Sequence, residues 1–146
     1  YMKKIVLFFF LSFIVYATFF TEKEWLDREV KRLCATDGGI KVYETVKLPA
    51  ERFDQYGQIR VPAKWLAEPG DEYYYESSTY YLKQGNPDMY QSHYKLYRVA
   101  DSKLLGELIR YSRRGGDIPG PWHPSSFGCP KETGFNDLEK QIFTKG

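Results

Sequence analysis

The sequence predicts an α+β fold, in which an N-terminal apolar helix is followed by an amphipathic helix that packs on a four-stranded antiparallel sheet. Three observations lead to this prediction. Residues 5–20 are almost uniformly apolar, residues 40–48 alternate apolar and polar side chains, and three segments between residues 72 and 114 are rich in tyrosine and aliphatic residues. With 146 residues, the chain has room for one domain beyond the apolar segment.

The apolar segment carries the strongest signal about location. Lys3 and Lys4 precede sixteen residues that Ser12 and Thr18 alone interrupt with polar side chains. A positive region before an apolar run is typical of an export signal or a signal anchor. A retained helix of this length spans about 24 Å, somewhat less than a hydrocarbon core of about 30 Å. Cleavage after Ala17 is the alternative.

Residues 1–20 are therefore predicted to be a signal anchor or a signal peptide, and residues 21–146 an exported domain. We expect the anchor to be retained, with residues 5–20 in the membrane. Positive residues favour the cytoplasmic side of a membrane, so Lys3 and Lys4 place the domain on the opposite side.

The two cysteines fit an oxidising compartment. Cys34 and Cys129 allow one pairing, which closes a loop of about 95 residues, and the chain-entropy model assigns such a closure roughly 4–5 kcal/mol as an upper figure. Two separate buried thiols are the alternative. No metal site is expected, because the cysteines and the two histidines, His93 and His123, lack ligand spacing.

Residues 21–36 predict an amphipathic helix. Thr21 and Glu24 form a capping-box pattern at its start, and Asp37-Gly38-Gly39 ends it. Its apolar stripe consists of Leu26, Val30, Leu33 and Cys34. No Pro or Gly separates this segment from the apolar run, so the two could also form one long helix.

Residues 40–48 predict the first strand. Ile40, Val42, Val46 and Leu48 share its apolar face. Glu44 interrupts that face, and we expect an edge position or an arginine partner for it rather than a catalytic role. The connection over residues 49–72 is rich in Pro and Gly, and Pro62 can begin one short helical turn within it.

Three further strands are predicted at residues 72–82, 89–100 and 104–114. A QGNPD sequence separates the first two, and Asp101-Ser102-Lys103 forms a tight connection between the last two. The result is an antiparallel meander. Residues 136–143 can form a last short helix.

Residues 115–130, GGDIPGPWHPSSFGCP, contain Asp117, His123, Ser125 and Ser126. A hydrolytic triad is not expected there. The segment lacks a G-x-S-x-G elbow, and its four prolines favour an extended course. We interpret it as a structural strap that a disulfide holds at Cys129, with a partner-contacting loop built on Trp122 as the alternative.

Composition and motifs exclude several function classes. The net charge is +2, and basic residues are interleaved with acidic ones, so a nucleic-acid interface is not expected. The chain contains neither a Walker sequence nor a dinucleotide fingerprint, so no cofactor is expected. A pair of carboxylates placed across a cleft is not evident either. We do not expect an enzyme.

Aromatic residues make up 18% of the chain, and Trp, Tyr and Arg are the usual anchors of protein interfaces. The partner-binding candidates are Trp65, Tyr73, Tyr75, Arg113, Arg114 and Trp122. Arg113 and Arg114, followed by two glycines, could instead bind an anion or pair with Asp117 or Glu107.

The stretches CATDGGIKVYETVKLP and YSRRGGDIPGPWHPSSFGCP resemble a group of short exported proteins of Gram-negative bacteria for which no activity is known. The likeness covers about residues 33–49 and 94–130. It implies a location on the bacterial inner membrane or in the periplasm, and no site residue.

A second likeness is architectural. An apolar N-terminal helix before a disulfide-bonded four-stranded sheet is similar to a type IV pilin. Pilins carry a glutamate at the fifth mature position, where this chain has Ile5 after two lysines, so a filament subunit is not the leading interpretation.

The function that we expect is a single-pass, periplasm-facing domain that binds another protein, as an accessory subunit of an envelope complex or as an inhibitor or immunity-type factor. The alternatives are a soluble exported binder of a small molecule or glycan, an exported hydrolytic enzyme, and a pilin-like filament subunit. An enzyme would need His93 or His123 to meet Glu44, Asp117 or a serine from another element.

Overall fold

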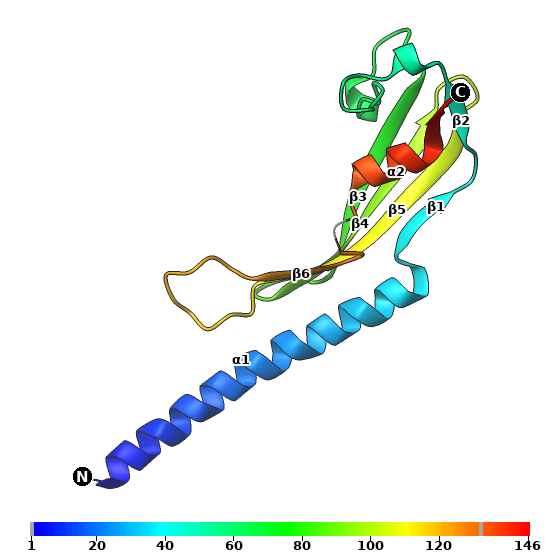
Figure 1. The fold of residues 1–146 in the computed structure, drawn as a ribbon. Helices are drawn as coiled ribbons and strands as arrows, with labels where there is room; N and C mark the ends of the chain where they lie inside the picture. The colour runs from blue at the N-terminus through cyan, green and yellow to red at the C-terminus, as the bar shows by residue number, and fades with distance from the viewer. Residues whose placement is uncertain (1, 132) are drawn as a thin grey trace.

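The computed structural model describes residues 2–131 and 133–146 (Figure 1). It has the predicted α+β fold, with a long N-terminal helix and a mostly antiparallel five-stranded sheet. The helices and strands are α1 (Met2–Asp37), β1 (Gly39–Val42), β2 (Val46–Leu48), β3 (Tyr73–Lys83), β4 (Asp88–Arg98), β5 (Lys103–Arg114), β6 (Ser126–Cys129), α2 (Phe135–Ile142) and β7 (Phe143–Lys145), with 3-10 turns η1 (Ala50–Arg52) and η2 (Lys64–Leu66).

The predicted antiparallel meander is formed by β3, β4 and β5. The main sheet has the order β1-β5-β4-β3, and β6 also pairs with β5. β1 pairs with residues 106–109 of β5 and β6 pairs with residues 111–114, so these two short strands follow one another along the same side of β5. β5 is therefore the central strand, and β3 lies at the far edge of the sheet.

α1 is one helix of 36 residues, about 54 Å long at 1.5 Å per residue. The predicted second helix is its C-terminal part. The capping box at Thr21 is wrong as a helix start, because the helix runs through this point without a break. The helix ends at Asp37, as predicted. Gly39, with φ of +106°, then turns the chain into β1.

The C-terminal part of α1 packs on one face of the sheet. Leu26 and Val30 are 1% and 0% exposed, and they pack in a cluster with Ile109 and Tyr111 of β5. The predicted disulfide joins this part of the helix to β6, with the Cα atoms of Cys34 and Cys129 6.2 Å apart. Leu33 and Cys34, the other two residues of the predicted stripe, are partly buried against the same cluster.

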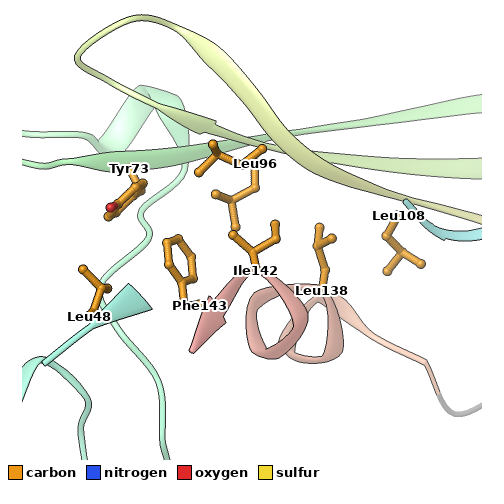
Figure 2. Close-up of a cluster of buried hydrophobic side chains, with 8 residues drawn as sticks. Leu48, Tyr73, Leu96, Leu108, Leu138, Ile142 and Phe143 are labelled. Atoms are coloured by element: carbon orange, nitrogen blue, oxygen red, sulfur yellow. The ribbon is translucent and has the colours of Figure 1, made fainter. Parts of the chain in front are cut away.

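α2, which begins and ends one residue before the helix expected over residues 136–143, packs on the opposite face. Leu138 and Ile142 point toward Leu96 and Leu108 of the sheet (Figure 2). Leu108 and Ile109 are neighbours in β5, and successive side chains of a strand point to opposite faces. The sheet therefore has α2 on one face and α1 on the other, in two separate hydrophobic clusters.

The single strand predicted over residues 40–48 is wrong. The chain bends after Val42, β1 stays in the main sheet, and β2 pairs in parallel with β7. The backbone N–H groups of Tyr43 and Glu44 both donate to the carbonyl of Leu105, where the pairing of β4 with β5 shifts register. All four apolar residues of the segment nevertheless contribute to the cluster beneath α2, as their alternation indicated.

The strap contains a strand that the sequence analysis did not predict. Residues 126–129 form β6, and Gly115 N–H donates to Ser125 O over 2.9 Å, which closes a loop between β5 and β6. The loop projects from the sheet along the N-terminal direction of α1 (Figure 1).

Candidate functional site

The N-terminal half of α1 exposes most of its apolar side chains. Its large apolar side chains between Met2 and Tyr16 are 44–78% exposed. An 18-residue window of this helix has a mean hydropathy of 2.0, and none of that window is buried. α1 is thus long and apolar enough to cross a membrane, a property that a signal sequence shares. Residue 1 of the predicted segment 1–20, and the side chains of Phe19 and Phe20, lie outside the described residues.

The domain begins to contact α1 just beyond the apolar run. Lys83 Nζ lies 2.7 Å from Glu22 Oε1, and Lys23 Nζ lies 2.8 Å from Asp117 Oδ1. These two ion pairs hold the end of β3 and the start of the 115–125 loop against consecutive residues of the helix.

The outer edge of β3 is the second exposed feature. This edge is covered only near its start, where the N–H of Tyr75 donates to the carbonyl of Pro62 over 3.0 Å and Ala63 forms a bridge with Tyr75. Backbone groups alternate sides along a strand, so Ser77, Thr79 and Tyr81 also direct their N–H and C=O groups outward. Over residues 2–131 and 133–146, no backbone group pairs with them. This is a free strand edge.

A groove opens where the covered part of this edge ends. It has a volume of about 280 Å³ and is lined by Ala63, Lys64, Trp65, Tyr75, Glu76 and Ser77. Trp65, on η2, is 81% exposed. Lys64 Nζ lies 2.9 Å from Glu76 Oε1, and this hydrogen bond raises the pKa of Lys64. The groove therefore offers an indole surface beside a compensated charge pair.

Apolar and aromatic side chains continue along the free edge. Tyr80, Tyr81 and Leu82 are 65%, 46% and 43% exposed. The rings of Tyr81 and Tyr90 lie 5.6 Å apart, so Tyr81 is supported from within the sheet. Tyr80 points to the opposite face because it is the preceding residue. A strand added to this edge would meet a tyrosine on each face.

The predicted partner-binding residues do not form one surface. Trp65 and Tyr75 lie together in the groove, and the Tyr75 ring packs on Phe135 at 4.7 Å. Arg114 is exposed at the end of β5, and Trp122 is 54% exposed in the 115–125 loop. These two residues belong to the other end of the sheet.

Two of the candidates are not available to a partner. Tyr73 is 6% exposed, because its ring packs on Phe143 at 4.7 Å beneath α2. Arg113 is 2% exposed, because it lies on the face that α1 covers, where its guanidinium pairs with Asp27. The prediction of both residues as contact anchors is wrong. The alternative partners expected for Arg113, Asp117 and Glu107, are also wrong.

The residues expected for a hydrolytic site do not come together. Glu44 pairs with Lys103 and Arg98, and their hydrogen bonds lower its pKa. An arginine partner was expected for this carboxylate. His123 is exposed on the loop. Asp117 accepts hydrogen bonds from Lys23 and Ser125, which hold its pKa well below its usual range. No histidine is among the described hydrogen-bond partners of Asp117 and Ser125, so they lack the general base of a hydrolytic triad.

His93 has a different neighbour. Its Nε2 atom lies 3.5 Å from Glu107 Oε2 on the sheet face that α1 partly covers. Nε2 is buried and has no hydrogen-bond partner among residues 2–131 and 133–146. No serine or cysteine nucleophile joins His93 and Glu107 in the described contacts. Among all the residues that the structure describes, no group of three His, Cys, Asp or Glu side chains could hold a metal ion.

Sequence reasoning missed the free edge of β3 and the groove beside Trp65. The strand itself was predicted, and so was the helical turn that carries Trp65. Their juxtaposition depends on the bridge between Ala63 and Tyr75, which no local pattern reveals.

No family model matches this chain, and no curated protein or solved structure matches it either.

Proposed function

We propose that this chain is a membrane-anchored domain that binds an extended segment of another protein by strand addition to the free edge of β3. The observation that carries the proposal is the row of unpaired outward-facing backbone groups at Ser77, Thr79 and Tyr81. An extended peptide that adds to a sheet edge satisfies such groups, and pockets beside the edge select its side chains.

The membrane location is supported by the exposed apolar half of α1. Lys3 and Lys4 favour the cytoplasmic side, so the proposal has the sheet on the periplasmic side of a bacterial inner membrane. A disulfide in the domain is compatible with that oxidising compartment. The chain then acts as an accessory subunit of an envelope complex or as an inhibitor of an envelope protein.

The groove indicates the kind of segment that fits. A strand that pairs with Ser77, Thr79 and Tyr81 runs directly into the groove beside Trp65. The indole of Trp65 and the ring of Tyr75 favour an apolar or aromatic side chain at that position of the partner. We therefore propose an extended partner segment with one such anchoring residue.

A second copy of the chain is a poorer fit to this edge. Successive contacts of Lys23 with Asp117, Asp27 with Arg113 and Asp37 with Tyr111 show that α1 runs antiparallel to β5. Identical β3 edges pair through a twofold axis perpendicular to the sheet. That axis would reverse the direction of α1, so two copies anchored in one membrane with the same orientation cannot pair in this way.

The test uses the full-length tagged protein in its native membranes. Thr79→Pro removes an outward N–H without removing a bond to β4, and edge positions tolerate proline for that reason. Thr79→Val keeps the N–H and is the matched control. We expect a mild-detergent pull-down, quantified by mass spectrometry, to recover a stoichiometric partner with the wild type and Thr79→Val, and at least tenfold less with Thr79→Pro. Strand addition is contradicted if Thr79→Pro and Thr79→Val recover equal amounts of the partner. It is also contradicted if the wild-type protein is recovered without any partner.

A further inference from the structure

We propose that the tip of the 117–124 loop lies in the headgroup region of the same bilayer, with Trp122 and Ile118 as its lipid-contacting side chains. This inference rests on the proposed anchoring of α1 and goes beyond it, because it assigns a second membrane contact to the domain. The occupant of this surface is a phospholipid bilayer.

The base of the loop is held in a defined position. Gly115 N–H donates to Ser125 O, Gly116 N–H donates to Asn86 Oδ1 over 2.8 Å, and the N–H and hydroxyl of Ser125 both donate to Asp117. These bonds join the two ends of the loop to each other and to the turn before β4. The tip is therefore presented in one direction.

Lys23 sets the height of the loop on the helix. Its ammonium group contacts Asp117 at 2.8 Å, three residues after the apolar run ends at residue 20. Three residues correspond to about 4–5 Å along the helix axis. The headgroup region of one leaflet is roughly 5–7 Å thick, so a membrane that contains the apolar run places this ion pair at headgroup level.

From Asp117 the loop continues toward the membrane side. In Figure 1 it extends away from the sheet in the direction of the N-terminus of α1. Ile118 and Trp122 are 37% and 54% exposed. The tip sequence, IPGPWHP, contains no Asp, Glu, Lys or Arg. Insertion of the tip therefore desolvates no permanent charge, and its prolines leave few backbone N–H groups to desolvate.

Tryptophan is the side chain that best fits this depth, because its apolar ring and its N–H group suit the boundary between acyl chains and water. A second tryptophan, Trp25, also lies near the headgroup level. Trp25 is 58% exposed and follows Lys23 by two residues, which is about 200° around the helix. Trp25 and the loop thus lie on opposite sides of α1, and two interfacial tryptophans flank the anchor.

The experiment uses three full-length variants that each keep one tryptophan of Trp25, Trp65 and Trp122, with phenylalanine at the other two positions. Each is reconstituted in phosphatidylcholine–phosphatidylglycerol vesicles with or without bromine at carbons 6 and 7 of the acyl chain. We expect bromolipid to quench Trp122 at least twofold more strongly than Trp65, which lies on η2 near the opposite end of β3.

The Trp25 variant separates the two hypotheses. If bromolipid quenches Trp25 but affects Trp122 no more than Trp65, the helix is anchored and the loop inference is wrong. If the protein does not float with the vesicles and none of the three tryptophans is quenched, the anchoring is wrong and the loop inference falls with it. Ile118→Asp, in the variant that keeps Trp122, should reduce the quenching at least twofold, because a carboxylate opposes insertion.

Discussion

The guanidinium of Arg113 pairs with the carboxylate of Asp27 across 86 residues of sequence, and joins the end of β5 to α1. The same guanidinium donates to Gly115 O over 2.6 Å and to Ser125 Oγ over 3.1 Å. One buried side chain therefore connects the helix, the central strand and the base of the loop.

Replacing Arg113 should destabilise the domain strongly. Arg113→Met leaves Asp27 without its buried partner, which typically costs about 3–5 kcal/mol of the free energy of unfolding. We expect this loss in urea denaturation of the full-length protein in detergent micelles. Arg114→Met is the matched control, because Arg114 is exposed, and it should change stability by no more than about 0.5 kcal/mol. The double variant Asp27→Leu, Arg113→Met should regain at least half of the stability that Arg113→Met loses. If it regains none, the guanidinium stabilises the domain mainly through its hydrogen bonds to Gly115 and Ser125 at the base of the loop.

Loss of the disulfide should also lower stability. Cys34 and Cys129 close a loop with a sequence separation of 95, for which the chain-entropy model gives about 4–5 kcal/mol, and measured losses are often nearer 2–4 kcal/mol. We expect Cys129→Ser to lower the free energy of unfolding by this smaller amount in non-reducing buffer. A reducing agent should destabilise the wild type equally and leave Cys129→Ser unchanged. Unchanged stability of Cys129→Ser would contradict the stapled strap.

Stability should fall as pH rises from about 4.5 to about 7, because Glu139 then ionises in the unfolded state before it ionises in the folded state. Burial raises the pKa of Glu139 from 4.5 to about 7, and the nearby charge of Asp54 adds to the effect. The folded state holds the proton more tightly, so the favourable contribution is complete below pH 4.5 and is lost as pH approaches 7. Glu139→Gln should be more stable than the wild type by about 2 kcal/mol at pH 8 and equal to it at pH 4. A constant difference across that range would show that Glu139 does not titrate on unfolding.

Gly106 should not accept a side chain. A Cβ atom there would lie 2.8 Å from Ile142 Cδ1 and 3.0 Å from the carbonyl of Lys41. We expect Gly106→Ala to cost about 1–3 kcal/mol through overpacking between β5 and α2. Ile142→Val removes the Cδ1 atom, so the double variant should be more stable than the sum of the single losses predicts. If the two losses are additive in a double-mutant cycle, the added Cβ atom is opposed by the carbonyl of Lys41 and not by the side chain of Ile142 on α2.

The elements that the sequence predicted correctly are those with a local pattern. The strands at residues 73–83, 88–98 and 103–114 have strand-forming residues and turn sequences between them. α2 and the C-terminal part of α1 each show an apolar stripe with helical spacing. The disulfide followed from a count of two cysteines.

The pairing of β2 with β7 could not be predicted in the same way. Apolar and polar side chains would alternate over residues 40–48 in the same way if the segment paired with one strand or with two. β7 has three residues and follows α2 directly, so it carries no strand pattern of its own. Which strand pairs with β2 is decided by packing between segments far apart in the sequence.

The candidate site shows the same limit. Strand alternation puts Tyr73 and Tyr75 on one face, but the position of α2 decides that Tyr73 is buried. Arg113 shares its face with Ile109 and Tyr111, an apolar face on which an arginine needs a partner. Asp27, next to Leu26 on the buried side of α1, was the signal that could have identified that partner.

The continuity of α1 has a mechanical consequence. Long helices usually bend at proline or glycine residues. α1 has neither between the apolar run and the packed C-terminal part. The 17 residues beyond residue 20 form a rigid arm of about 25 Å. In the proposed membrane-anchored state, a 20° tilt of the helix in the bilayer would swing the far end of this arm by about 9 Å. Bilayer thickness would thereby set the angle at which the sheet meets its surroundings.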